Sequence, residues 1–280
     1  MRYDSGMEYR PGRALRTTSA AKFRAIVLWS VWGLAGGYAI RALQLDPISW
    51  VVLLAVPFGW TTLIKGRLRS YNTAAQPAQA ALKQGNPEIA ERGFRQVRER
   101  FHWPRFLPRL ADYNCAQALL RQGRHAEAIE LLERVDRAGG VINVDGAIAG
   151  TLSLLHALRG NRELAEEWFG EAEQRSRTYA NPGAFPNIMA EVAVALRRSE
   201  SREIRVRLDN EWAQIEHSLT GERLRPLRIL RAFAIAQELR DAAAASSVLA
   251  GLGGARAREF AYLGTEWPEL QQFIVANLPA

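Results

Sequence analysis

The sequence predicts an all-α protein in which a two-helix transmembrane hairpin precedes an α-solenoid built from helix pairs. Two nearly uninterrupted apolar runs, Ala25–Ile40 and Pro47–Ile64, are separated by only six residues. From Tyr71 onward the chain has the 3.6-residue apolar periodicity of amphipathic helices, and glycine-containing turns recur at nearly constant spacing. These observations predict a hairpin over residues 23–64 and a helical repeat domain over residues 71–280.

Each apolar run is close to the length that a helix needs to cross a bilayer. A helix rises about 1.5 Å per residue and the hydrocarbon core is about 30 Å thick, so a span takes about 20 residues. We expect the spans at about residues 23–44 and 47–64, the second opening with Asp46 as its N-cap. A cleaved signal peptide and a buried soluble hairpin are the alternatives. The presence of a second run argues against the former, and the near absence of polar residues against the latter.

Charge predicts the orientation of the hairpin. The chain carries a net charge of +8, yet residues 70–280 hold 27 basic and 26 acidic residues, so the excess lies at the two ends of the hairpin. Basic flanks stay on the cytoplasmic side, which predicts an inner or cytoplasmic membrane protein with both termini in the cytoplasm and residues 1–22 as a basic cytoplasmic segment. A single cysteine agrees with a reducing compartment. The flank residues, which also suit contact with anionic lipids, are Arg13, Arg16, Lys22, Arg24, Lys65, Arg67 and Arg69.

Small residues on the first span predict close helix packing in the membrane. Gly33 and Gly37 have the GxxxG spacing that lets a second backbone approach. The second span is the simplest neighbour, and a homodimer or a partner subunit is the alternative. Neither run contains Asp, Glu, Lys or His, which argues against a transporter or an intramembrane protease.

Three turns in the following domain line up with one another. They contain Gly85, Gly123 and Gly160, spaced by 38 and 37 residues. Behind each glycine, at fixed offsets, come a small residue, a bulky one and another apolar one: Ala90, Ala128 and Ala165, then Phe94, Leu132 and Phe169, then Val97, Val135 and Ala172. The segment Tyr113–Glu130 is the clearest copy and resembles the tetratricopeptide repeat, a helix-turn-helix unit of about 34 residues. The resemblance is clearest over residues 74–178.

Later segments keep the rhythm of helix pairs without this signature. We expect helices at 186–198 and 201–219, at 224–239 and 241–252, and a closing helix at 267–278. The breaks between them contain the Gly, Pro and Asn residues typical of turns.

The resemblance implies a curved solenoid whose concave face binds a protein or peptide partner. On this reading the groove residues are Tyr113, Asn114, Gln117, Leu120 and Arg121, and Asn114 matches an asparagine that holds ligand backbone in some family members. The family's clamp for an acidic peptide terminus needs a lysine and a second asparagine, where this sequence has Tyr113 and Gln117, so that clamp is not predicted. The alternative is that this face contacts the adjacent repeat.

Enzymatic signatures are weak, and we expect no catalytic residues, no metal site and no cofactor. His102, His125, His156 and His217 lack metal-ligand spacing, and Cys115 falls where the repeat packs its helices together. Between residues 92 and 109, arginines alternate with aromatic residues, a mixture that can bind nucleic acid. The domain as a whole is nearly neutral, however, so nucleic acid is not the expected partner. The sequence therefore predicts a membrane-anchored adaptor or scaffold. The alternative is a structural or regulatory accessory subunit of a larger membrane complex.

Overall fold

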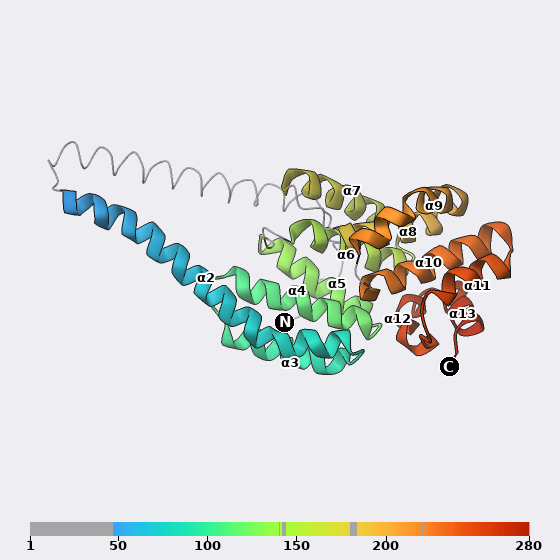
Figure 1. The fold of residues 1–280 in the computed structure, drawn as a ribbon, viewed down its shortest axis with the longest axis horizontal. Coiled ribbons are helices and arrows are strands. Elements are labelled where there is room, and N and C mark those ends of the chain that lie inside the picture. Colours follow the sequence, from blue (N-terminus) through green and yellow to red (C-terminus); the bar gives the residue numbers. More distant parts are fainter. Residues whose placement is uncertain (1–46, 140, 142–143, 180–183, 220, 280) are drawn as a thin grey trace, which may run out of the picture.

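The computed structural model describes residues 47–139, 141, 144–179, 184–219 and 221–279, except for the side chains of 47–58, 176–179, 184–186, 218 and 222 (Figure 1). Within these residues every regular element is a helix. The α-helices are α2 (Pro47–Lys83), α3 (Pro87–Arg100), α4 (Phe106–Arg121), α5 (His125–Arg137), α6 (Asp145–Leu158), α7 (Arg162–Tyr179), α8 (Ala184–Arg197), α9 (Ser201–Ser218), α10 (Gly221–Leu239), α11 (Ala242–Ala250), α12 (Ala261–Gly264) and α13 (Pro268–Asn277), with a 3-10 turn, η1, at Ala257–Glu259. The later predicted helices correspond to α8 to α11 and α13.

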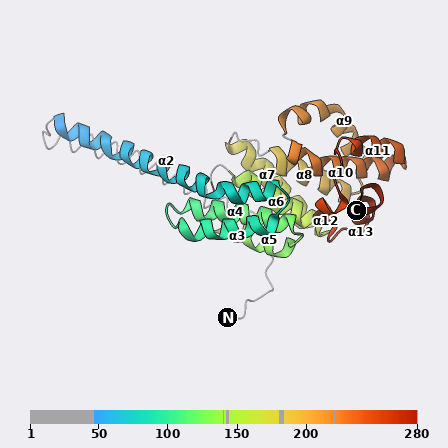
Figure 2. The same cartoon turned by 60° about the horizontal axis from the view of Figure 1, so that its bottom comes forward.

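Successive helices form antiparallel pairs, which stack side by side (Figures 1 and 2). The pairs are α2 with α3, α4 with α5, α6 with α7, α8 with α9, and α10 with α11. The third and fourth pairs meet closely through α6 and α8, where a methyl group on Gly150 would collide with Asn187. The described part of the chain is therefore a helical solenoid, as the sequence predicts.

One turn geometry joins the two helices of each pair. Gly85, Gly123 and Gly160 adopt φ angles of 79°, 73° and 82°, the left-handed region that glycine enters without strain. Backbone bonds such as Arg124 N–H to the Leu119 carbonyl close the end of the helix in the Schellman pattern. Ser199 and Arg240 occupy the same place in the fourth and fifth pairs, with φ of 62° and 51°. The repeat thus continues past the last glycine signature.

The predicted small and bulky positions lie in the core. Ala90, Ala128 and Ala165 are at most 1% exposed, because the two helices of a pair touch there. Phe94 and Leu132 are equally buried. Phe169 differs from this pattern, since it is only partly buried and its neighbour Trp168 is fully buried instead.

Helix α2 joins the predicted second span to the first repeat without a break. The predicted domain boundary at Tyr71 therefore falls inside a helix, although Tyr71 is the first fully buried core residue among those described. The N-terminal half of α2 projects from the stacked pairs (Figure 1). Within the described residues, no helix has the length and apolarity needed to cross a membrane. The first predicted span, with Gly33 and Gly37, lies outside these residues, as do Arg13, Arg16, Lys22 and Arg24.

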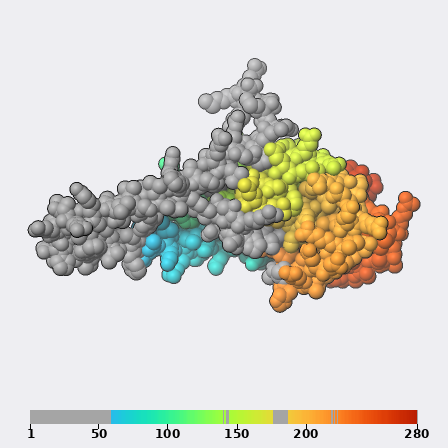
Figure 3. Space-filling model, turned by 90° about the horizontal axis from the view of Figure 1, so that it is seen from above, coloured from blue at the N-terminus to red at the C-terminus, as the bar shows by residue number. Residues whose placement is uncertain are grey.

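The C-terminal elements fold back onto earlier pairs. Helix α13 packs on α10, where Phe233 contacts Trp267 and Phe273 with ring centroids 5.7 and 5.4 Å apart. In the space-filling view, residues of α9 and α10, in orange, form much of the surface at this end of the molecule (Figure 3). Between α11 and α13 the chain returns to the ends of α4, α6 and α8, which it contacts through Tyr262, Glu266 and Trp267.

Candidate functional site

The five residues predicted to line a groove lie along α4. They are one, three or four positions apart, a spacing that places them on one side of the helix. Leu120 is 5% exposed and belongs to the core, which corrects its assignment to an open groove. Tyr113, Asn114, Gln117 and Arg121 are partly buried, and each contacts another element.

Asn114 contacts the first helix pair. Its side-chain amide donates a hydrogen bond of 3.2 Å to the hydroxyl oxygen of Tyr71 on α2. Burial raises the pKa of Tyr71 to about 12, against the lowering effect of this hydrogen bond. The tyrosine is therefore a neutral hydroxyl at physiological pH, and the bond joins α2 to α4.

Gln117 and Tyr113 contact the third pair. The Gln117 amide donates a hydrogen bond of 3.1 Å to Thr151 Oγ1 on α6, and Thr151 in turn donates to the Ala147 carbonyl at 2.7 Å. Tyr113 also hydrogen-bonds Thr151, and burial raises the pKa of its hydroxyl. Polar residues of α4 thus connect the first helices of neighbouring pairs. This is the alternative that the sequence left open, and partner binding by this face stays a prediction.

The first three helix pairs share one architecture, in which a glycine with positive φ joins the two helices and a buried alanine lies where they touch. Residues 78–140 match the tetratricopeptide repeat family. The matched residues cover the end of α2, all of α3, α4 and α5, and the start of the next turn. No curated protein and no solved structure matches the chain.

Residues 260–267, which we call the closing segment, contact the part of the chain that matches this family. The Arg121 guanidinium lies 4.9 Å from the centroid of the Tyr262 ring. His125, 1% exposed, has its Nε2 atom 2.9 Å from the Tyr262 carbonyl oxygen. A methyl group on Gly123 would meet Thr265. The fourth of the polar groove residues, Arg121, therefore faces the chain's own C-terminal part.

Two further residues of the closing segment bind the ends of α5, α6 and α8. Glu266 lies 3.3 Å from His125 Nδ1 and 3.0 Å from Arg159 Nε. Burial lowers the pKa of His125, although the charge of Glu266 opposes this effect.

Trp267 is held by Arg197. The Arg197 guanidinium stacks 3.9 Å from the centroid of the Trp267 ring and donates to the carbonyls of Ala157 and Leu158, the last residues of α6. Sequence reasoning placed a closing helix here but missed Tyr262 and Glu266, because nothing in a single sequence pairs them with residues more than 100 positions away.

A buried ion cluster lies between α5 and α7. Arg175, 5% exposed, donates to Asp136 and, at 2.7 Å, to Glu171. Burial alone would lower the pKa of Arg175, but the hydrogen bonds and charges of the two carboxylates raise it. The guanidinium stays charged and its charge is balanced. This cluster joins one pair to the next and has no open face for a substrate.

No group of three metal-ligating side chains occurs among the described residues. Cys115 is buried, and burial raises its pKa to about 11, so it is a protonated core residue rather than a nucleophile. His156 is also buried, and burial lowers its pKa to about 4. Phe94 and Phe101 are buried as well, which removes them from any base-stacking surface.

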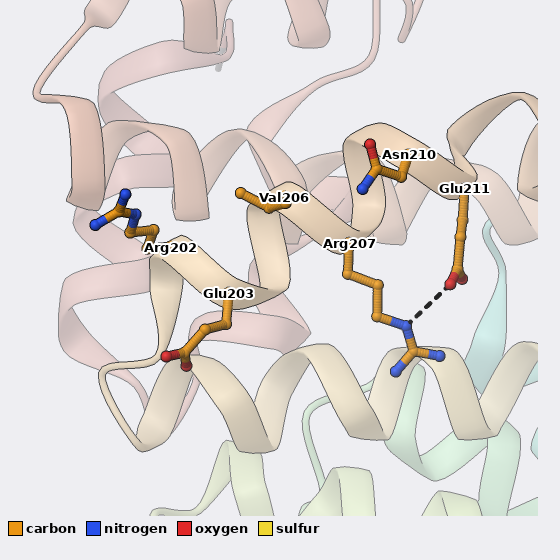
Figure 4. A pocket seen from close by; sticks show the side chains of 6 residues that line it. All are labelled: Arg202, Glu203, Val206, Arg207, Asn210 and Glu211. Carbon is orange, nitrogen blue, oxygen red and sulfur yellow. Dashed lines mark hydrogen bonds and ion pairs between the residues drawn. The ribbon is translucent and has the colours of Figure 1, made fainter.

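A hollow of about 530 Å³ lies along α9, lined by Arg202, Glu203, Val206, Arg207, Asn210 and Glu211 (Figure 4). All six come from one helix, and Arg207 is paired with Glu211 at 3.3 Å and with Glu191 of α8. Cations and anions alternate along this face and neutralise one another. The hollow has no convergent set of groups for catalysis.

Proposed function

We propose that the protein is a membrane-anchored adaptor that presents a tetratricopeptide repeat domain to a protein or peptide partner at the cytoplasmic face. The observation that carries the adaptor role is the family match at residues 78–140 within a stack of helix pairs, because repeats of this kind serve as protein-binding surfaces. Asn114, Gln117 and Arg121 supply amide and guanidinium groups that remain partly exposed beside their internal partners. Such groups suit a peptide backbone and an acidic or aromatic side chain.

Membrane anchoring is supported by the sequence. The run from Pro47 to Ile64 precedes Lys65, Arg67 and Arg69, all three exposed on α2, and the run from Ala25 to Ile40 follows a basic segment. Two apolar runs with basic outer ends match the positive-inside pattern with both termini in the cytoplasm.

A second candidate is a structural or regulatory accessory subunit, in which the solenoid acts as a brace. The observation that favours it is the internal engagement of the α4 face. Asn114, Gln117 and Arg121 contact Tyr71, Thr151 and Tyr262 respectively. A face held in this way on three sides need not bind anything else.

Crosslinking and capture from native membranes separates the two candidates. For an adaptor, Asn114→Ala with Arg121→Ala abolishes capture of the partners that the wild-type chain retains. The matched control is Glu130→Ala with Arg134→Ala, which removes an exposed pair on α5 and leaves no unpaired partner. Equal capture by both double variants, with a partner that stays stoichiometric after detergent extraction, would support the accessory subunit instead.

Topology is tested with reporters on the full chain. A reporter fused after Ala280 is expected in the cytoplasm, and one inserted between Leu43 and Gln44 outside it. The reverse pattern, or a chain that is released from membranes by salt alone, would contradict the two-span anchor.

A further inference from the structure

The loop between α3 and α4, residues 101–105, lies against α2 at the C-terminal end of the apolar run and just beyond it. The Trp103 and Trp60 rings meet edge to face with centroids 5.3 Å apart, and Phe101 meets Tyr71 in the same way at 5.6 Å. Trp60 and Leu63 are each 51% exposed. Beyond this point α2 projects away from the stacked pairs (Figure 1). An aromatic loop of the solenoid therefore sits at the foot of the proposed second span.

Cations surround this aromatic contact. The guanidinium groups of Arg67 and Arg100 lie 6.0 and 5.7 Å from the centroid of the same ring, that of Phe101. Two further exposed cations lie close to these in the sequence: Lys65 on α2, two residues before Arg67, and Arg105 in the loop, five residues after Arg100. Like charges gathered around one ring repel each other, and an anion between them would relieve the repulsion.

Carboxylates do not supply that anion. No described carboxylate forms an ion pair with Lys65, Arg67, Arg100 or Arg105. Two other arginines of α3 behave differently, since Arg95 pairs with Glu91 and Arg98 with Asp112, each at 2.7 Å. The end of α3 thus carries positive charge that the described part of the chain leaves open.

We propose that the end of α3 and the α3–α4 loop form a second membrane contact, in which Arg100 and Arg105 bind the phosphates of anionic lipid headgroups while Trp103 lies at the bilayer interface beside Trp60. The inference rests on the proposed membrane anchor. Trp60 is four residues from the end of the predicted span, about 6 Å along the helix axis, the depth at which tryptophan favours a bilayer interface. Continuity with the apolar run and the uncompensated cations select a lipid surface as the occupant.

A fluorescent reporter on the full chain tests this contact. In a Cys115→Ala background, an environment-sensitive dye is attached to His102→Cys in the loop or to Ala126→Cys, an exposed position of α5 at the opposite end of α4. The chain is reconstituted into vesicles of phosphatidylcholine with or without phosphatidylglycerol, each with a trace of spin-labelled lipid. We expect the dye at residue 102 to be quenched, more strongly with phosphatidylglycerol, and the dye at residue 126 to stay unquenched.

Charge reversal supplies the second arm. Arg100→Glu with Arg105→Glu is expected to lower quenching at residue 102 about fivefold on anionic vesicles without releasing the chain. Arg92→Glu with Arg258→Glu changes the net charge equally at exposed positions outside the loop, and is expected to leave the quenching unchanged. Vesicle-bound chain with an unquenched dye at residue 102, or equal loss in both double variants, would overturn the loop contact alone. Wild-type chain absent from the vesicle fraction would overturn the anchor, and this inference with it.

Discussion

The imidazole Nε2 of His125 lies 2.9 Å from the carbonyl oxygen of Tyr262, a residue 137 positions further along the chain. In a solenoid each repeat ordinarily contacts only its neighbours, so this bond connects elements that the repeat pattern alone keeps apart. The closing segment makes the connection, and Trp267, 3% exposed, is its largest buried side chain.

Truncation of Trp267 tests how much the closing segment contributes to stability. Trp267→Ala removes the contacts with Phe233 and Arg197 and leaves a cavity, so we expect the free energy of unfolding to fall by about 3 to 5 kcal/mol. Val275→Ala on α13 is the control, because Val275 is 60% exposed and its loss is expected to cost less than about 0.5 kcal/mol. Denaturant unfolding followed by circular dichroism measures both. Equal stability of the two variants would show that the closing segment is not held to the earlier repeats.

Burial of His156 predicts an acid-sensitive fold. The side chain is 4% exposed, neither ring nitrogen is hydrogen-bonded, and burial lowers its pKa from 6.5 to about 4. Between these values the unfolded chain binds a proton that the folded chain does not, so the free energy of unfolding falls as pH drops from 6.5 to 4. The loss is about 3 kcal/mol at most, and this contribution is constant above pH 6.5.

His156→Leu is expected to remove the part of the fall in unfolding free energy at acid pH that His156 causes. The measurement compares unfolding free energies at pH 7.5 and pH 4.5 for the wild type and the variant. His217→Leu, at an exposed position, serves as the control and is expected to follow the wild type. An unchanged difference between the two pH values in His156→Leu would contradict the assignment.

The non-glycine turns are expected to carry backbone strain. Ser199 has φ of 62°, so Ser199→Gly is expected to raise the free energy of unfolding by about 1 kcal/mol. Gly85→Ala is the matched opposite and is expected to lower the free energy of unfolding. A methyl group there meets no atom within 4 Å, so the loss of stability comes from the φ angle of 79° alone. Thermal unfolding of the pair checks the sign. Ser199→Gly with a lower midpoint would mean that the serine side chain stabilises this turn.

The repeat register is tested at Ala128. This residue is fully buried between α4 and α5, so Ala128→Glu places an unpaired charge in the core and is expected to cost about 4 kcal/mol. Ala126→Glu, two positions earlier and exposed, is expected to change stability by less than about 0.5 kcal/mol. A helical spectrum and melting point unaffected by Ala128→Glu would count against the register.

The regular spacing of glycines was enough to predict the turns of the first three pairs. It did not predict the turns of the fourth and fifth pairs, where another residue stands in place of glycine. Ser199 and Arg240 adopt the left-handed turn that Gly85, Gly123 and Gly160 mark, but neither residue type indicates it. At Ser199 the turn is closed by the backbone, through the bond from Glu200 N–H to the Ala195 carbonyl, and not by a side chain that a sequence pattern shows. The helices of the last pairs were still predictable, since their apolar periodicity survives the loss of the signature.

The site was predictable only in part, for a related reason. Helical spacing placed Asn114, Gln117 and Arg121 on one side of α4, as the structure has them. It did not indicate what they face. Asn114 and Gln117 contact residues about one repeat away, whereas Arg121 contacts Tyr262, whose position depends on how the helices from α5 to α11 stack. Contacts of the first kind follow from a repeat, and contacts of the second kind require the complete fold.

Helix α2 has a mechanical consequence. It runs for 37 residues, about 55 Å, and its C-terminal part is fixed to the core through Tyr71 and α3. A helix of this length behaves as a stiff rod rather than as a flexible linker. Any tilt or rotation imposed on its projecting end is therefore transmitted directly to the first repeat, so the domain takes its orientation from whatever surrounds that end instead of swinging freely beside it.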